Sequence, residues 1–277
     1  MAFSSTIAIL AHRQDGFWDR PRLIHLLMSR WEEMGLKSAV ATDPEHPVPA
    51  ELALLHVSLT VVPEEYRGLS ACYPRTLNGA VCDLRKSGFS RLLVEPGDGH
   101  PGPVIVKTDW NAGGVRELRV AKWWRPARLE AARPWSSRRA LPEGGYRVYP
   151  SVDDVPRGVW RNPNLVVERF LAERQEGQYL CRHWLFLGTR EITRRTLSSE
   201  PSVKFRGVME RTADPVPAEL RRVRAAMGFD YGKFDYGIVD GEVALYDVNR
   251  TPGAAADPRL HDETVDALAP GIRDYLT

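Results

Sequence analysis

The segment FDYGIVDGEVALYDVN places the strongest constraint on how this chain can fold. Its two apolar, alternating runs flank Asp240-Gly241, a dipeptide typical of a two-residue β-hairpin turn. Pairing across this turn brings Asp235 nearly opposite Asp247, and alternation along the strand puts Asn249 on the same face as Asp247. Three oxygen ligands then converge in a manner that suits Mg²⁺ or Mn²⁺. For an isolated Asp-x-Asn, a hairpin with a solvated polar face is the commoner alternative.

A second segment, PVIVKTDWNAGG, reads as a buried strand that ends in a charge. Lys107 follows the apolar run directly, and a turn containing Gly113 and Gly114 comes next. The bare backbone N–H groups of such a turn can bind phosphate oxygens. Taken singly, a lysine in water and an ordinary glycine turn explain the pattern more simply.

A third segment, LVVERFLAE, is an apolar strand interrupted by Glu168 and Arg169. A core strand is the simpler interpretation of this segment alone. It could also be a hinge whose backbone binds an adenine ring while Phe170 and its apolar neighbours pack around that ring. Glu173 or Glu176, on the loop beyond, could then accept hydrogen bonds from ribose hydroxyls.

The N-terminal part of the chain has a different pattern. Strand-like residues 6–10 and 37–43 flank a helical pattern opened by a proline and closed by a glycine, which favours a small parallel α/β layer. The loop AHRQDGF follows the first strand at its carboxyl end, where open α/β sheets bind ligands. His12, Arg13 and Asp15 are therefore candidate substrate-binding residues, although solvated charges are equally ordinary in such a loop.

The remaining elements come from hydrophobic periodicity. It predicts helices over 76–89 and 217–228, and strands within 146–150, 164–173, 179–188 and 190–197. Within the apolar run YLCRHWLFLG, we expect Arg182 to face a cleft and His183 to face the other way.

The order and spacing of the three segments resemble the ATP-grasp superfamily over residues 103–253, most specifically in the final DVNRTPG. The resemblance implies an α/β protein in which two α+β lobes clasp ATP, preceded by a small parallel α/β domain. The corresponding domains are 1–75, 76–172 and 173–277. The chain departs from the usual pattern in two places. Asp247 stands where the family commonly has Glu, and only Arg85 and Lys86 are available as an upstream phosphate-binding cation.

Carried over to this chain, the resemblance also implies a role for each segment. Lys107 would contact the α- and β-phosphates, and the mobile loop with Gly113 and Gly114 would cover the β- and γ-phosphates. The nucleotide would also meet an adenine hinge formed by Glu168, Arg169 and Phe170, with Glu176 beyond it. Asp235, Asp247 and Asn249 would hold Mg²⁺, and Lys233 would reach the phosphates. Five cationic residues fall where the family surrounds the transferred phosphate: Arg182, Arg194, Arg195, Lys204 and Arg206.

The activity implied by the resemblance is that of an ATP-dependent ligase. It would join a carboxylate to an amine through an acyl phosphate, with ATP and Mg²⁺ or Mn²⁺ as cofactors and small, amino-acid-like substrates. A kinase that phosphorylates a small molecule, and a nucleotide-binding protein without turnover, are the alternatives. We find no Ser-His-Asp or Cys-His pattern for a protein nucleophile, and the reaction needs none.

Composition bounds the partners and the compartment. The 38 basic and 36 acidic residues leave a net charge of +2, which gives no reason to expect nucleic acid or a membrane surface as the main partner. The three cysteines form no CxxC pair, and the N-terminus lacks the basic and apolar segments of a signal peptide. We therefore expect a cytoplasmic protein, and a homodimer is left open.

Overall fold

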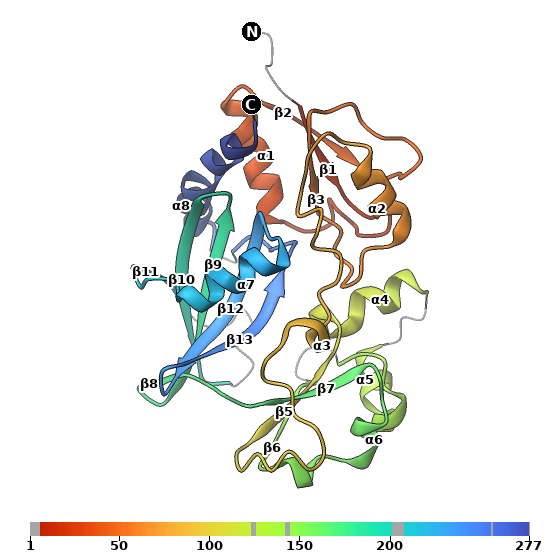
Figure 1. Ribbon diagram of the computed structural model, residues 1–277, viewed down its shortest axis with the longest axis vertical. Coiled ribbons are helices and arrows are strands. Elements are labelled where there is room, and N and C mark those ends of the chain that lie inside the picture. Colours follow the sequence, from red (N-terminus) through yellow and green to blue (C-terminus); the bar gives the residue numbers. More distant parts are fainter. Residues whose placement is uncertain (1–5, 123–125, 142–144, 201–207, 256, 277) are drawn as a thin grey trace.

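Three β-sheets frame the part of the chain that the structure describes (Figure 1). The structure is a computed structural model, and it describes residues 6–122, 126–141, 145–200, 208–255 and 257–276. In the view of Figure 1, a parallel sheet lies at the upper right, the largest sheet at the left, and a three-stranded sheet at the bottom.

The N-terminal sheet is parallel, in the strand order β2-β1-β3-β4. Its strands are β1 (Thr6–Leu10), β2 (Lys37–Ala41), β3 (Leu52–Leu55) and β4 (Thr76–Leu77), and its helices are α1 (Leu23–Glu33) and α2 (Glu64–Ala71). Ile7 and Ile9 pack with α1 in one core, whereas Ala8 and Leu10 pack with α2 in another. Burial on both faces explains the unbroken apolar run of β1. The predicted strand–helix–strand is confirmed, and the sheet extends past residue 75 because β4 pairs with β3.

The predicted helix over 76–89 is wrong, because only α3 (Lys86–Phe89) is helical there. Asn78 adopts the left-handed conformation, with φ of 58°. Its buried side chain accepts a hydrogen bond from the Asp230 N–H (2.9 Å) and donates one to the Tyr231 carbonyl (2.8 Å). Because Asn78 is left-handed and its side chain hydrogen-bonds the backbone of a distant strand, a helix does not continue through it. The chain between Asn78 and α3 is therefore irregular.

The three-stranded sheet is antiparallel, in the order β6-β5-β7. Its strands are β5 (Val104–Thr108), β6 (Arg147–Tyr149) and β7 (Leu165–Arg169); the short helices around it are η1 (Asn111–Gly114), α4 (Val115–Val120), α5 (Ala127–Ala131), η2 (Trp135–Ser137), η3 (Val152–Asp154) and α6 (Arg157–Trp160). Val104, Val106 and Val167 face an apolar core that includes residues of η3 and α6. Because side chains alternate along a strand, Lys107 and Glu168 lie on the opposite face.

The large antiparallel sheet has the order β11-β10-β9-β12-β13, with β8 added beside β9. Its strands are β8 (Arg174–Gln175), β9 (Gln178–Leu187), β10 (Arg190–Ser198), β11 (Val208–Thr212), β12 (Tyr231–Val239) and β13 (Glu242–Asn249); the associated helices are α7 (Ala218–Met227), α8 (Arg259–Leu268) and η4 (Ala269–Tyr275). Trp184 and Phe234 share a core with α7, whereas Leu185 and Leu187 share one with α8 and α1. The large sheet is therefore covered by α7 on one face and partly by α8 on the other.

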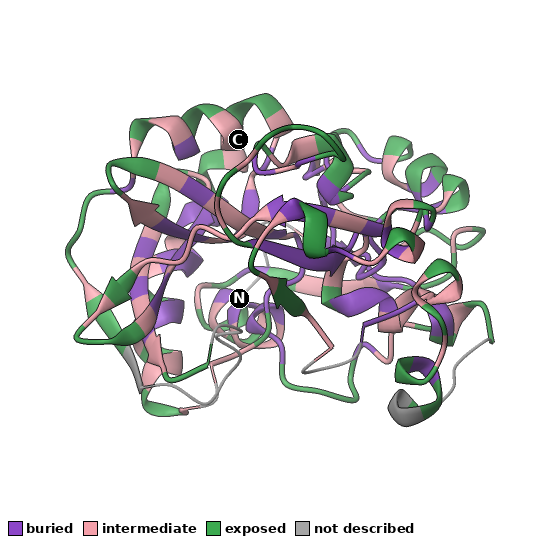
Figure 2. Cartoon of the chain, turned by 90° about the horizontal axis from the view of Figure 1, so that it is seen from below, coloured by how far each residue is buried: buried purple, intermediate pink, exposed green. Residues whose placement is uncertain are grey.

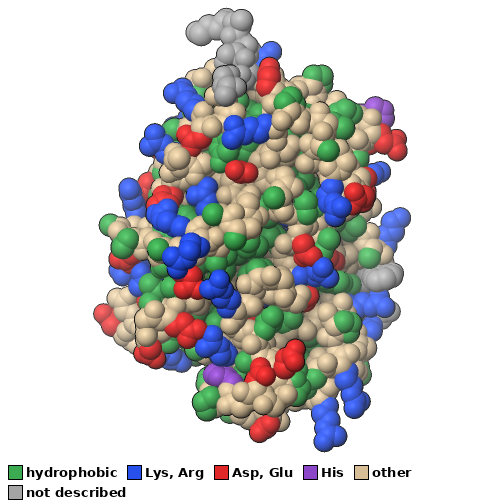
Figure 3. All heavy atoms as spheres, viewed as in Figure 1, with side chains coloured by type: hydrophobic (Ala, Val, Ile, Leu, Met, Phe, Trp, Pro, Cys, Tyr) green, Lys and Arg blue, Asp and Glu red, His purple; other side chains and the backbone are tan. Residues whose placement is uncertain are grey.

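The distribution of exposed residues agrees with this layering. Figure 2 shows buried residues gathered along the central strands, and exposed residues on the loops and on the outer sides of the helices. On the face seen in Figure 3, basic and acidic side chains are interspersed, as the near balance of charge implies. Among the described helices, none is long and apolar enough to cross a membrane.

Candidate active site

The predicted hairpin forms, and it brings the three candidate metal ligands to one face. Asp240 and Gly241 both have positive φ, at 51° and 82°, as a type I′ turn requires. Asp235 on β12 pairs directly with Asp247 on β13. Asn249, two residues further along β13, lies on the same face as Asp247.

A β-bulge sets this register. Next to the turn the two strands pair regularly, but between Asp235 and Tyr236 the register shifts by one residue, and Tyr246 on β13 is the extra residue. Without the bulge, Asp247 would pair with Phe234 and face the apolar core beneath α7. The bulge therefore turns Asp247 toward the same side as Asp235.

Asp235 is held by two cationic or polar side chains on the same face. Lys233 Nζ lies 2.9 Å from Asp235 Oδ1, and His183 Nδ1 lies 2.6 Å from the same oxygen. Burial alone would raise the pKa of Asp235, but Lys233 and His183 outweigh it and hold this pKa well below its ordinary value. Both contacts go to Oδ1, so within the described residues Oδ2 is the oxygen left for a cation.

Asp247 faces a buried lysine from another element. Lys86, in α3, is 2% exposed, and its Nζ lies 3.4 Å from Asp247 Oδ1. The same Nζ donates to the Trp110 carbonyl (3.4 Å) and to Asn111 Oδ1 (3.3 Å). Arg85, the other upstream candidate, is half-exposed and pairs with Asp83. The structure thus places Lys86, and not Arg85, beside the candidate metal ligands.

Lys107 and Glu168 form a buried ion pair on the face of the small sheet turned toward the hairpin. Their Nζ and Oε2 atoms are 2.6 Å apart, and the side chains are 9% and 1% exposed. Lys107 Nζ also donates to the Tyr246 carbonyl at the bulge (3.4 Å), which links the two sheets. Burial and the nearby Asp247 raise the pKa of Tyr146, on the small-sheet side, to about 12.

The expected adenine hinge has some of its backbone groups already in use. The Arg169 N–H donates to the Leu92 carbonyl (2.7 Å), and the Phe170 N–H donates to the Pro103 carbonyl (2.8 Å). The Arg169 side chain pairs with Glu242. These two N–H groups are therefore not free to bind a nucleotide.

The glycine loop is a tight left-handed turn at the end of β5. Ala112, Gly113 and Gly114 have φ of 50°, 65° and 73°, and both glycines are buried. Asn111 anchors the turn on two sides, since its N–H donates to Thr60 Oγ1 (2.9 Å) and its side chain donates to the Val248 carbonyl (3.0 Å). The loop thus lies between the N-terminal domain and β13.

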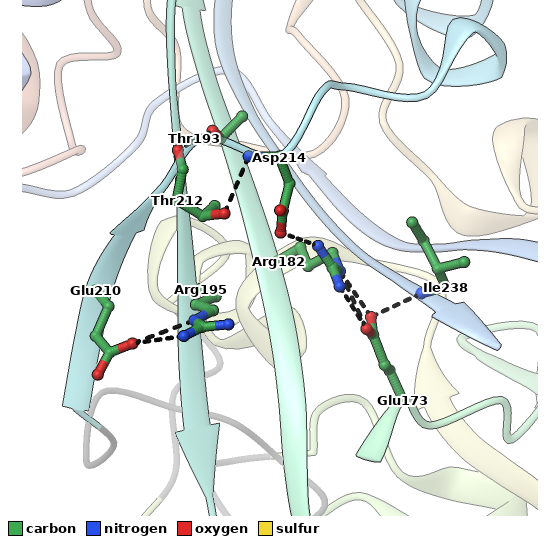
Figure 4. Close-up of polar contacts among 8 residues, drawn as sticks. All are labelled: Glu173, Arg182, Thr193, Arg195, Glu210, Thr212, Asp214 and Ile238. Carbon is green, nitrogen blue, oxygen red and sulfur yellow. Dashed lines mark hydrogen bonds and ion pairs between the residues drawn. The ribbon is translucent and has the colours of Figure 1, made fainter. Parts of the chain in front are cut away.

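Arg182 does not face the candidate metal ligands, and that part of the prediction is wrong. Asp235 pairs with His183, whereas Arg182 pairs with Tyr236 and so lies on the opposite face of the sheet. Figure 4 shows Arg182 between Glu173 and Asp214, to which it is joined by ion pairs of 2.7 and 2.5 Å. Glu173 is the main reason why the pKa of Arg182 is raised.

Two other predicted cationic residues, Arg195 and Arg194, are paired with acidic side chains outside the hairpin. Arg195 pairs across the strands with Arg182 and forms an ion pair with Glu210 (3.0 Å; Figure 4). Arg194 faces α8, where it contacts Glu263 (2.8 Å). Lys204 and Arg206 lie outside the described residues.

The two candidate ribose acceptors have different surroundings. Glu173 binds Arg182 and accepts from the Ile238 N–H (2.8 Å), so its carboxylate is already engaged. Glu176 is exposed, with φ of 52°, at the tight turn between β8 and β9.

The N-terminal loop lies where β1 and β3 end. The buried ring of His12 accepts a hydrogen bond from the Gln14 N–H. The Arg13 backbone N–H donates to Tyr66 Oη. The Asp15 carboxylate accepts from the Ser58 N–H (2.8 Å). Arg116 donates to both the Ser58 carbonyl (3.1 Å) and Thr251 Oγ1 (3.3 Å). The loop therefore approaches the segment that follows Asn249.

Sequence reasoning missed several residues of this region. His183 was expected to face away from the cleft, and Lys86 was one of two open possibilities. Arg22, His56 and Tyr231 were not considered, because each stands in an ordinary apolar or loop context. A buried lysine or histidine is a signal only once the fold shows what surrounds it.

Comparison with known proteins gives structural likeness alone. No protein-family profile matches the sequence, and no curated protein matches it. The chain is similar in structure to a RimK domain ATP-grasp protein from Sphaerobacter thermophilus DSM 20745, with 14% identity, a TM-score of 0.50, and coverage of 98% and 99% of the two chains. It is also similar to the macrocyclase MdnC bound with precursor peptide MdnA from Microcystis aeruginosa MRC (11% identity, TM-score 0.55, coverage 97% and 99%). A third similar structure is the D-cycloserine synthetase DcsG (12% identity, TM-score 0.51, coverage 98% and 100%).

Proposed function

The chain has the ATP-grasp fold, and we propose that it is an ATP- and Mg²⁺-dependent ligase that joins a carboxylate to an amine. The observation that carries this proposal is that lysines from different elements converge on the face of the β12–β13 hairpin that carries Asp235 and Asp247. Lys233 contacts Asp235, and Lys86 contacts Asp247. Lys107, on the small sheet, donates to the carbonyl of the bulge residue Tyr246, which directly precedes Asp247.

The donor set suits a hard divalent cation. Asp235, Asp247 and Asn249 offer two carboxylates and an amide oxygen, which are the ligand types that Mg²⁺ prefers. The bound ion would supply positive charge beside the transferred phosphate. Asn249 Oδ1 also accepts from the Thr251 N–H (2.8 Å), which holds that oxygen in place.

The residues of this chain act by binding and by charge. In the proposed reaction, an oxygen of the acid substrate attacks the γ-phosphorus of ATP, and the bond to ADP breaks. The amine then attacks the acyl carbon, its nitrogen gives up a proton to solvent, and phosphate leaves with the bonding electrons. Lys86, Lys107 and Lys233 would stabilise the negative charge that develops on the transferred group.

The roles assigned from the sequence to the glycine loop, the segment 168–170 and the N-terminal loop remain proposals. Gly113 and Gly114 would lie over phosphates, and the carbonyl groups of the segment 168–170 would lie beside adenine. His12, Arg13 and Asp15 would contact substrate from the N-terminal loop. Arg182 and Arg195 are not proposed as catalytic residues, because they lie on the face opposite Asp235.

The substrate class is proposed from chemistry and from fold neighbours. The similar structures include a macrocyclase bound with a precursor peptide and a D-cycloserine synthetase. Amino acids and peptides therefore form the natural set to test. A kinase remains the alternative, because both reactions need the same ATP site.

A substrate screen tests this proposal. The protein is incubated with MgATP and pools of amino acids and peptides, and ADP, free phosphate and product mass are measured together. We expect ADP, phosphate and an amide in equal amounts. ADP with a phosphorylated product and no free phosphate would instead identify a kinase. MgATP binding without turnover on any pool would favour a nucleotide-binding protein.

Two matched variants connect the activity to the hairpin. Asp247→Asn removes a charge from the candidate metal face, and we expect turnover to fall by about 100-fold or more. Asp240→Asn, at the exposed hairpin turn, keeps a residue that tolerates positive φ, so activity should be unchanged. Equal activity of the Asp247→Asn variant and the parent protein would remove Asp247 from the proposed site.

A further inference from the structure

A group of buried polar side chains lies beside the candidate active site, where β1 and β3 end. Arg22 precedes α1 and is 7% exposed, His56 follows β3, and Tyr231 begins β12; the last two are fully buried. Among the described residues, no hydrogen-bond partner reaches Arg22 Nε and Nη1, either ring nitrogen of His56, or Tyr231 Oη. Each of the three residues therefore has unused hydrogen-bonding capacity in the interior.

These side chains come from distant parts of the chain but lie together. The rings of His56 and Tyr231 have centroids 6.2 Å apart. The ring of Phe17 lies 5.8 Å from the His56 ring and 5.8 Å from the Arg22 guanidinium carbon. Burial, and then the charge of Arg22, hold the pKa of His56 well below its ordinary value, so its imidazole is neutral.

This arrangement is unfavourable unless something completes it. A buried hydrogen-bonding group without a partner destabilises a protein, and a buried charge without a counter-charge does so more strongly. Among the described residues, the Arg22 guanidinium makes one hydrogen bond, from Nη2 to the Asp15 carbonyl (2.9 Å). The Asp15 carboxylate accepts hydrogen bonds from Ser58 and forms no ion pair with the guanidinium among the described residues, although its charge favours the charged form of Arg22.

The unused atoms share one chemistry. The guanidinium and phenol atoms are donors, and neutral His56 offers one N–H, so the group can bind a ligand with several acceptor oxygens. Arg116 and Arg250 also act on His56, but their guanidiniums donate to Ser58 and Thr251 and to the carbonyls of Val57, Leu59 and Val81. Arg22 is therefore the guanidinium with open donors, and a planar carboxylate matches two of them.

We propose that Arg22, His56 and Tyr231 form a binding site for a substrate carboxylate that is not the one activated by ATP. This inference rests on the proposed ligase function. Tyr231, Lys233 and Asp235 share one face of β12, and positions two residues apart on a strand are separated by about 7 Å. Arg22 also pairs with Gly253, in the segment that follows Asn249. The preferred substrate therefore carries a second carboxylate near its reacting group, and binding displaces the Phe17 ring.

The test is direct binding of small probes, without turnover. The protein with ¹³C-labelled histidine is titrated with glutarate, neutral glutaramide and inorganic phosphate, and the His56 ring signal is followed by NMR. We expect a saturable shift with glutarate and none with glutaramide. The absence of any shift with glutarate would mean that ordered water completes the site, and tighter binding of phosphate would overturn the carboxylate assignment.

Tyr231→Phe is the sharpest variant because it removes only a hydroxyl that has no hydrogen-bond partner among the described residues. Glutarate binding should weaken by about tenfold or more, while resistance to urea in the absence of ligand stays the same or increases. The matched control is Tyr73→Phe, in the core on the other face of the N-terminal sheet, which should bind glutarate like the parent protein. Unchanged binding in the Tyr231→Phe variant would overturn the proposal.

The two proposals fail separately. A protein that binds glutarate at His56 but forms no amide with any substrate would sink the ligase function and leave the carboxylate site. If the protein is a ligase but Tyr231→Phe changes neither glutarate binding nor the KM of the acid substrate, the carboxylate site is wrong and the ligase function stands.

Discussion

At the scale of single residues, burial controls the protonation of three histidines around the N-terminal loop. Burial lowers the pKa of His12, His25 and His56, most strongly for the fully buried His56. Arg22, His25, Arg116 and Arg250 surround His56 and act in the same direction. In the unfolded chain these histidines titrate near their ordinary pKa of about 6.5.

We predict that the protein loses stability as the pH falls below about 6.5. In this range the unfolded state binds protons that the folded state excludes, so the free energy of unfolding decreases toward acid. One histidine that stays neutral contributes a loss of about 1.4 kcal/mol between pH 7.5 and 5.5. His56→Gln should reduce the difference in urea stability between these two pH values by about that amount.

The control for this measurement is His100→Gln, at the end of an exposed loop. It should lose as much stability between pH 7.5 and 5.5 as the parent protein. An unchanged pH dependence in the His56→Gln variant would show that His56 is protonated in the folded state.

Some residues of the candidate site could be read from the sequence, and others could not. The two-residue turn located Asp235 and Asp247 near each other on adjacent strands, but regular pairing across it would set Asp247 opposite Phe234, and only the bulge puts both carboxylates on one face. Lys86 was not predictable, because its approach to Asp247 depends on how α3 packs against the large sheet. The orientation of Arg182 was mistaken because either face of β9 could have been the cleft face, and only pairing with β12 settles it.

At the scale of elements, the hairpin and its bulge are the critical unit. Gly232 on β12 lies under the end of β13, where a Cβ atom would stand 2.7 Å from the Asn249 carbonyl oxygen and 3.0 Å from the Phe229 ring. The absence of a side chain at Gly232 thus allows β13 to approach closely at Asn249.

We predict that Gly232→Ala disturbs both stability and metal-dependent binding. The added methyl group should force β13 away and lower the free energy of unfolding by about 1–3 kcal/mol. It should also weaken ATP binding in the presence of Mg²⁺ more than in EDTA, because Asn249 moves. Urea unfolding and calorimetric titration measure the two effects.

Gly88→Ala is the matched control. Gly88 lies in α3, and a Cβ atom there would meet nothing within 4 Å. Stability should stay the same or rise slightly, since Ala favours helix more than Gly does. Equal behaviour of the two variants would contradict the close approach at Asn249.

The elements that were predicted correctly are those with local patterns. Turn residues and alternation located β12 and β13, and a left-handed glycine, Gly228 with φ of 72°, ended α7 as expected. The bulge at Tyr246 has no such local sign, and neither does the role of Asn78, which binds a strand 152 residues away. Both depend on tertiary contacts that periodicity does not encode.

At the scale of the whole molecule, one buried arginine joins the N-terminal domain to the large sheet. Arg250 is 1% exposed and donates to the backbone carbonyls of Val57 (2.9 Å), Leu59 and Val81. Burial lowers the pKa of Arg250 to about 10. Its three hydrogen bonds connect the loop after β3 and the link to α3 with the segment that follows β13.

We predict that Arg250→Met weakens the docking of the N-terminal domain. The side chain keeps most of its apolar volume, but three carbonyl groups lose their partner, which should cost about 3–5 kcal/mol. In calorimetry we expect a single unfolding transition to split in two, with the N-terminal domain melting first.

The control is Arg259→Met, which removes an 89% exposed arginine paired with Asp257. Exposed ion pairs contribute little, so its melting curve should match that of the parent protein within about 1 kcal/mol. A single transition at unchanged temperature in the Arg250→Met variant would mean that other contacts hold the domains together.

Asn249 and Arg250 are neighbours in the chain, and this adjacency limits how the protein can be recombined. The residue proposed to hold a metal and the residue that joins the domains share one peptide bond. A chimera that took its N-terminal domain from a relative would also have to supply carbonyl groups in the positions of Val57, Leu59 and Val81. Otherwise the graft would shift Asn249 along with its neighbour. The N-terminal domain is therefore not an exchangeable cassette, and a successful exchange would carry the segment 249–253 with it.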